Sequence, residues 1–220
     1  MMSPTITAIT EQARRRGRLN IFIDGAYAFS LHASLAACLE VGRDLSPLEI
    51  AELKRRDLFE SAYQAALRYI ALRPRSEKEM RQYFVRRGLG QEAIEGLLER
   101  LRAEGWVDDG AFAAFWVDNR EAFRPKGRWA LSAELREKGV AQEAIEAALD
   151  PLDEEESAQR AAEKALRRYA SLDEEAFRRR LSGYLQRRGF AAEVCRRIVE
   201  RLWREVERER LAKADPLQGE

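Results

Sequence analysis

The spacing of apolar residues changes near position 32 and divides the chain into a short β-rich front and a long helical part. The front reads as three strands at residues 5–13, 19–23 and 26–31, joined by a polar turn at Arg14–Arg18 and a tight turn at Asp24-Gly25. Glycine accepts positive φ without a Cβ clash, so an Asp-Gly pair favours a hairpin turn. The pattern predicts a small antiparallel β meander over residues 1–32, supported by the helices that follow.

From His32 onward the pattern is helical. The run Ser46-Pro47-Leu48-Glu49 is typical of a helix start, with serine as N-cap, proline at the first position and glutamate placed for a capping box. We expect a connecting helical segment at residues 33–57.

An internal repeat organises the rest of the chain. Gly88, Gly139 and Gly189 are 51 and 50 residues apart, and apolar residues recur in register around each of them. Upstream, the aligned i, i+4 pairs are Met80 and Phe84, Leu131 and Leu135, and Leu181 and Leu185. Downstream, the aligned i, i+4, i+7 stripes are Ile94, Leu98 and Leu101, then Ile145, Leu149 and Leu152, then Cys195, Val199 and Leu202. Such spacing places each set on one helix face.

Each unit is therefore expected to hold three helices, with its glycine as a left-handed residue at a helix end. A single unit buries little apolar surface, so neighbouring units should stack. We predict a mainly α fold of tandem three-helix repeats in an elongated curved array, preceded by the meander. The repeats are expected at residues 58–107, 108–153 and 154–210, with a polar tail at 211–220.

Several residues have a structural interpretation. The pair Asp108-Asp109 predicts a helix N-cap, and the acidic run Asp153–Glu156 predicts charge complementation at the start of a helix. Trp106 and Trp116 are expected to be core anchors. The single histidine, His32, belongs to no catalytic or metal-ligating pattern and is interpreted as structural.

Composition removes several function classes. Hydrophobic residues make up 45% of the chain and charged residues 35%, while the net charge is only +1. Bulk charge therefore does not indicate a nucleic-acid binder. Cys38 and Cys195 are far apart and predict reduced thiols, without a disulfide framework. With no signal peptide, no apolar run of the ~18 residues that a membrane span needs, and no catalytic, cofactor-binding or metal-ligating pattern, we expect a cytoplasmic protein that is not an enzyme and uses no cofactor.

Basic residues gather at one position of the repeat, around its second helix. This recurrence predicts a basic stripe that binds a partner, although a solvated face of mixed charge would give the same pattern. In the third repeat the corresponding residues are Arg178, Arg179, Arg180, Arg187 and Arg188. The predicted partner-binding residues lie in the first two repeats and are Arg75, Arg81, Arg86, Arg87, Arg124, Lys126, Arg128, Arg136 and Lys138.

The chain resembles the RecX family of bacterial regulatory proteins. The resemblance is carried by GWVDDGAFAAFWVDNREAFRPKGRWALSAELREKGV (residues 105–140), NIFIDGAYAFSL in the front part, and ALRYIALRPRSEKEMRQYFVRRG in the first repeat. It covers residues 5–207, and the third repeat departs most because it lacks the Arg-Pro pair of the other two. The resemblance implies a regulator of homologous recombination, DNA repair and the SOS response. Such a protein binds the RecA filament on single-stranded DNA and lowers its ATPase, strand-exchange and coprotease activities.

Two other function classes are compatible with the same residues. Three-helix units can imitate helix-turn-helix modules, which would make the chain a direct DNA-binding protein whose affinity falls steeply with salt. A generic helical scaffold for another protein is the second alternative. A weak direct DNA contact is also compatible with the RecA interpretation.

Overall fold

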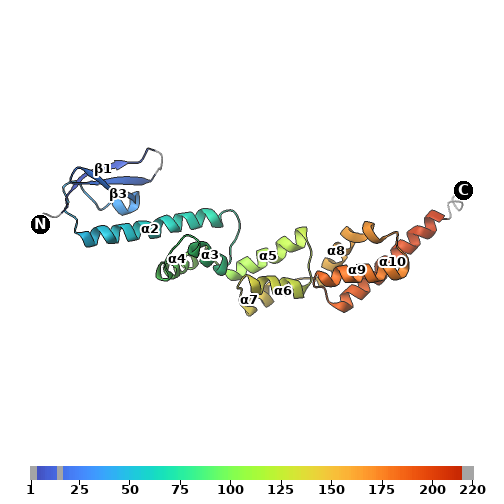
Figure 1. Ribbon diagram of the computed structural model, residues 1–220. Helices are drawn as coiled ribbons and strands as arrows, with labels where there is room; N and C mark the ends of the chain where they lie inside the picture. Colours follow the sequence, from blue (N-terminus) through green and yellow to red (C-terminus); the bar gives the residue numbers. More distant parts are fainter. Residues whose placement is uncertain (1–3, 14–16, 215–220) are drawn as a thin grey trace. The chain divides into compact units, whose positions relative to one another are not determined.

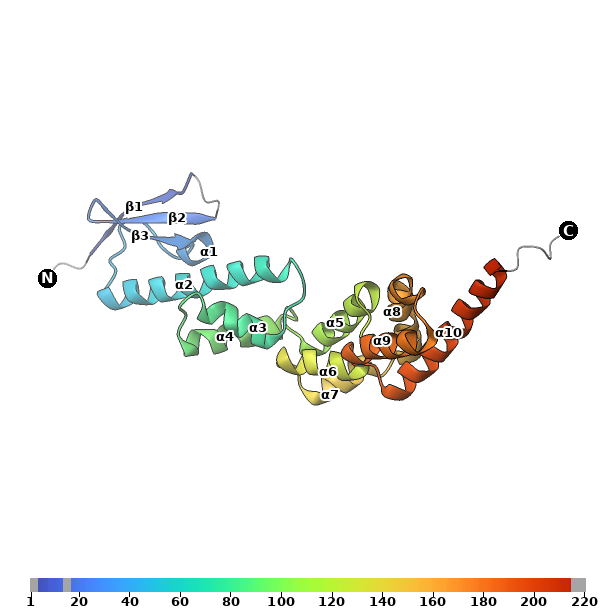
Figure 2. The same ribbon diagram turned by 45° about the vertical axis from the view of Figure 1, so that its right-hand side comes forward.

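The computed structural model describes residues 4–13 and 17–214 of the 220-residue chain. These residues form two compact units (Figure 1 and Figure 2). The first unit holds the described residues up to Arg73 together with Met80–Trp106. The second holds Pro74–Glu79 and the described residues from Val107 onward.

The predicted meander is confirmed. Strands β1 (Ile6–Glu11), β2 (Arg18–Ile23) and β3 (Ala26–His32) form an antiparallel sheet in the order β1-β2-β3. At the β2–β3 turn, Asp24 and Gly25 have φ values of 48° and 85°, as an Asp-Gly hairpin requires. The Arg14–Arg16 part of the turn predicted between β1 and β2 lies outside the described residues.

The meander packs on the helices that follow it, as expected. Ile6, Ile21 and Leu31 are buried with Leu45 in one apolar cluster. Arg18 of β2 forms an ion pair of 2.7 Å with Asp57. The sheet therefore gains from its neighbours the support that three short strands need.

The connecting helical segment expected at 33–57 contains two helices separated by turns. It holds the four-residue helix α1 (Ala33–Ala36), then turns at residues 37–46, then α2 (Pro47–Ile70). The turns place Leu39 and Leu45 in the meander core, a tertiary contact that local periodicity cannot reveal. The predicted capping box of α2 is confirmed, with the Glu49 amide donating to Ser46 Oγ at 3.2 Å. Because α2 runs unbroken through residue 57, no helix end marks the expected boundary there.

The helical repeat is confirmed. After α2 the chain forms α3 (Glu77–Val85), α4 (Gln91–Ala103), α5 (Asp109–Phe123), α6 (Arg128–Glu137), α7 (Gln142–Leu149), α8 (Glu154–Tyr169), α9 (Glu174–Arg187) and α10 (Ala192–Ala214). Gly88, Gly139 and Gly189 follow α3, α6 and α9 with φ values of 74°, 84° and 81°, so each is left-handed as predicted. The aligned apolar positions on both sides of each glycine are buried.

Within the second unit, the start of α6 in one repeat contacts the glycine turn of the next repeat. The amide of Gly127 donates to the carbonyl of Arg188 at 3.0 Å. A Cβ added at Gly189 would lie 2.4 Å from Cβ of Ala130. The same relation recurs earlier in this unit, where Ser76 Oγ donates to the carbonyl of Lys138 at 2.8 Å. Aligned positions therefore make equivalent junction contacts.

The predicted caps are confirmed in part. Asp108 caps α5 through the amides of Gly110 and Ala111, and Asp153 caps α8. Asp109 instead accepts from the amide of Glu77 at 2.9 Å, a contact with the start of α3. The prediction for Trp106 was wrong, since 51% of this side chain is exposed. Trp116 is partly buried against the core of its repeat, as expected.

Candidate partner-binding surface

The nine predicted basic residues fall into two groups in the structure. Four are exposed: Arg86, Arg87, Arg124 and Arg136. The other five are partly buried: Arg75, Arg81, Lys126, Arg128 and Lys138. The structure therefore does not leave all nine cations equally available to a partner.

The exposed arginines lie where helices end. Arg86 and Arg87 follow α3, and Arg87 stacks over the Tyr83 ring at 4.5 Å. Arg124 is the C-terminal cap residue of α5. Arg136 lies in the last turn of α6, where its guanidinium donates to the neutral amide oxygen of Gln142, at 3.0 and 3.2 Å. Guanidinium groups of this kind remain able to bind carboxylate or phosphate.

Lys126 is held within its own repeat by the carboxylate of Glu134. That carboxylate also accepts from Trp116 Nε1 and Arg120 Nε, each at 2.8 Å. Burial raises the pKa of the Glu134 carboxyl, but the hydrogen bonds from Lys126, Trp116 and Arg120 outweigh burial and hold the pKa below its usual range. The role of Lys126 in the structure is to neutralise a half-buried anion.

Sequence reasoning missed Glu134, which organises this network. Its neighbours gave a signal, because Trp116 and Arg120 are an i, i+4 pair on one helix face. Nothing in the spacing indicated that the α6 carboxylate would face that pair.

Arg128, one of the predicted partner-binding residues, has a role inside its own repeat. Its Nη2 donates to the carbonyl of Leu152 at 2.7 Å and of Asp150 at 3.3 Å. These carbonyls follow α7, where backbone acceptors lack helical partners. Arg128 thus caps the end of α7 rather than facing solvent.

The remaining basic residues are also engaged. Lys138 forms an ion pair of 2.8 Å with Glu79 and lies 5.1 Å from the centre of the Trp116 ring. Arg81 pairs with Glu95, with 2.9 Å between Nη2 and Oε2. Arg75 is partly buried. The partner-binding role of these residues stays a prediction.

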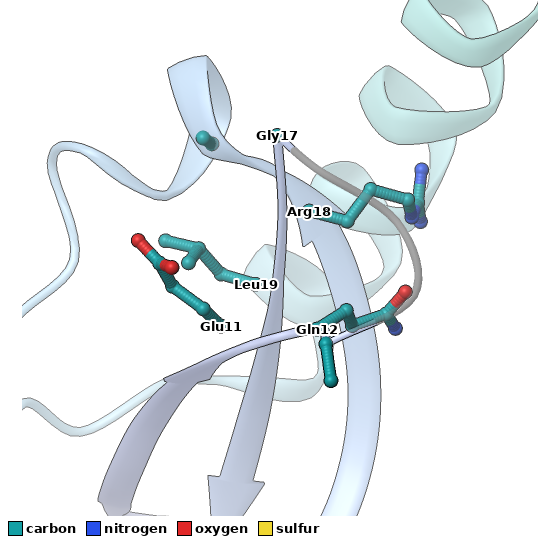
Figure 3. A pocket seen from close by; sticks show the side chains of 7 residues that line it. Glu11, Gln12, Gly17, Arg18 and Leu19 are labelled. Carbon is teal, nitrogen blue, oxygen red and sulfur yellow. The ribbon is translucent and has the colours of Figure 1, made fainter.

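A hollow of about 480 Å³ lies at the connection between β1 and β2 (Figure 3). Glu11, Leu19 and Arg18 are among the residues that line it, and the Arg18 side chain points away from the other two and pairs with Asp57. Elsewhere in the described chain, no three histidine, cysteine or acidic side chains gather in a way that could hold a metal ion. The two thiols are free, with Cys38 exposed and Cys195 buried.

None of the described helices combines the length and apolar character that crossing a membrane requires.

Burial raises the pKa of the Cys195 thiol and favours its neutral form. The surface features left to explain are therefore the arginines at the helix ends and the exposed apolar side chains.

Comparison with known proteins covers nearly the whole chain. Residues 4–44 match the regulatory protein RecX N-terminal domain. Residues 62–101, 108–149 and 153–199 match the first, second and third three-helix domains of RecX. The regulatory protein RecX of Bacillus licheniformis is 32% identical over 196 residues, covering 87% of this chain and 74% of the relative. That of Bacillus subtilis is 30% identical over 204 residues, covering 90% and 77%.

Solved structures agree with the sequence matches. A crystal structure described as regulatory protein RecX superposes with a TM-score of 0.73 at 29% identity, covering 90% of this chain and 99% of the other. A crystal structure of RecX from Lactobacillus salivarius gives a TM-score of 0.59 at 22% identity, covering 66% and 96%. The second likeness concerns the fold.

Proposed function

The chain belongs to the RecX family of regulatory proteins, and from this premise we propose that it binds the RecA filament on single-stranded DNA and lowers the filament's ATPase, strand-exchange and coprotease activities. The observation that supports a binding role is the recurrence of exposed arginines at the helix ends of successive repeats, at Arg86, Arg87, Arg124 and Arg136. Exposed arginines on successive repeated units suit a partner that itself repeats. The proposed site of action is the cytoplasm, where RecA works.

The exposed arginines are the best place to test the proposal. We expect Arg124→Glu with Arg136→Glu to relieve inhibition of RecA's DNA-dependent ATPase, because a like-charge contact would replace an attractive one. Surface changes of this kind should alter the free energy of unfolding by no more than about 0.5 kcal/mol. Arg128 is unsuitable for this test, since its reversal would uncap α7.

A matched control reverses charge at Glu99 of α4 and Glu143 of α7, two exposed carboxylates on helices that carry none of the four arginines. Glu99→Arg with Glu143→Arg should inhibit RecA as well as the unchanged protein does. Glu155 makes a poor control because it pairs with Arg197 and Arg201. If the arginine reversal inhibits with undiminished potency, these cations form a solvated face and the proposed surface is wrong.

The same arginines would serve a direct DNA-binding protein, and salt separates the two functions. Binding to naked single-stranded DNA that rests on phosphate contacts should weaken steeply between about 50 and 200 mM salt. Strong binding to naked DNA, with unchanged RecA activity once free DNA is in excess, would favour direct DNA binding. If the chain binds neither RecA nor DNA, the remaining candidate function is that of a generic helical scaffold for another protein.

A further inference from the structure

An exposed tryptophan marks the junction of the second and third repeats. Trp129 lies in the first turn of α6 with 75% of its surface exposed. The other three indoles make hydrogen bonds or packing contacts within the protein. Trp106 and Trp116 donate to glutamates, and Trp203 is buried. Among the described residues, Trp129 is the indole with neither burial nor a hydrogen bond.

Beside Trp129 lies a hollow of about 380 Å³, here called the Trp129 hollow. Its lining is Arg128, Trp129, Glu154, Gln186, Gly189, Phe190 and Ala191. The polar groups in its walls are largely occupied. Arg128 caps α7, and Glu154 Oε1 accepts from the amides of Arg128 at 3.2 Å and Ala191 at 3.3 Å. Because these polar groups already have hydrogen-bond partners, the hollow suits an apolar side chain.

Three exposed arginines lie on the helices that form this hollow or on the segment next to them. Arg136 lies seven residues after Trp129, on the same face of α6. Arg187 follows Gln186 of the lining, and Arg124 precedes Pro125, whose carbonyl accepts from Arg188 at 3.0 Å. These three arginines are exposed, and none forms an ion pair with an acidic side chain of the described chain.

We infer that the Trp129 hollow receives an apolar side chain from an acidic segment of the protein partner, whose carboxylates pair with Arg124, Arg136 and Arg187. Tryptophan and arginine are the residues most enriched at the energetic centres of protein interfaces. The hollow lies between Trp129 and the buried Phe190, and a protein segment can supply both the apolar side chain that fills it and the carboxylates that pair with the arginines. The inference rests on the proposed function, since the filament is taken as the partner.

Cosedimentation of the full chain with RecA filaments on single-stranded DNA tests this inference about the Trp129 hollow. We expect Trp129→Ala to weaken binding at least ~30-fold, the loss typical of a central interface tryptophan. Arg136→Glu with Arg187→Glu should weaken it about 10-fold and flatten its salt dependence. The matched control Leu48→Ala removes another exposed apolar side chain, on α2, and should change binding less than about 2-fold.

A photo-cross-linking amino acid placed at position 129 identifies the occupant. The cross-linked partner peptide should be rich in aspartate and glutamate and carry an apolar residue. If the unchanged chain does not sediment with the filament, the proposed function fails. If it does and Trp129→Ala binds equally well, only the present inference is overturned. Cross-links to DNA, or to a peptide without acidic residues, would also overturn it.

Discussion

Replacing Gly88, Gly139 and Gly189 by alanine, one at a time, distinguishes the free-energy cost of a left-handed backbone from the cost of crowding at the junctions between repeats. All three have φ between 74° and 84°, so a Cβ costs about 1 kcal/mol at each from the left-handed backbone alone. Their surroundings differ. A Cβ at Gly88 would meet nothing within 4 Å, whereas one at Gly139 would lie 2.8 Å from Cβ of Lys78. One at Gly189 would lie 2.4 Å from Cβ and 2.6 Å from the backbone N of Ala130.

The expected losses in the free energy of unfolding therefore rise along the series. Gly88→Ala should lose about 1 kcal/mol from strain alone. Gly139→Ala should lose about 2 kcal/mol, because Cβ of Lys78 can move only with its backbone while the rest of that side chain shifts, and the larger Gly139→Val should lose more. Gly189→Ala should lose about 3 kcal/mol or more, because overpacking against a backbone atom forces the two repeats apart.

Urea unfolding followed by circular dichroism measures these losses, and each kcal/mol should lower Tm by about 2–4 °C in a chain of this size. Adding Ala130→Gly to Gly189→Ala should recover part of the loss, since it removes one of the two close contacts. Adding Ala130→Gly to Gly88→Ala should recover none of the loss in the free energy of unfolding. Equal losses at all three glycines would refute the packing argument and leave only backbone strain.

Two further predictions concern charge and chemistry. Glu134→Gln should destabilise the protein by about 1–3 kcal/mol at neutral pH, because Lys126 and Arg120 lose their anion. Since the folded pKa of Glu134 is lowered, this stabilisation exists above the unfolded pKa and is lost as pH falls through the folded pKa. Urea unfolding of both proteins from pH 7 downward should show the difference shrinking, and a constant difference would contradict it. The purified chain alone should not hydrolyse ATP; turnover above contaminant level in a coupled assay would contradict the non-enzymatic interpretation.

Much of the fold could be read from local rules in the sequence. The Asp24-Gly25 turn, the Ser46–Glu49 capping box and the three left-handed glycines each depend on the backbone preferences of one or two residues. The repeat was visible because buried positions recur with helical spacing. The meander strands were likewise predicted to within a few residues of their ends.

The availability of the basic side chains could not be read in the same way. Lys126, Arg128 and Lys138 looked equivalent to Arg124 and Arg136 in the sequence. Whether a cation faces solvent depends on which carboxylate or carbonyl a different helix brings within about 3 Å. Glu134 and the end of α7 supply those partners from elements that local spacing does not position.

Trp129 and Trp106 show the same limit for apolar residues. Tryptophan is a large apolar residue and Trp106 was expected in the core, yet both side chains are exposed in the structure. The sequence by itself determined the elements, their repeat and their turns, because these follow from backbone preferences and from periodicity along one chain. The tertiary structure alone decided which charges are neutralised and which aromatic rings remain exposed, because burial depends on neighbours that are distant in sequence.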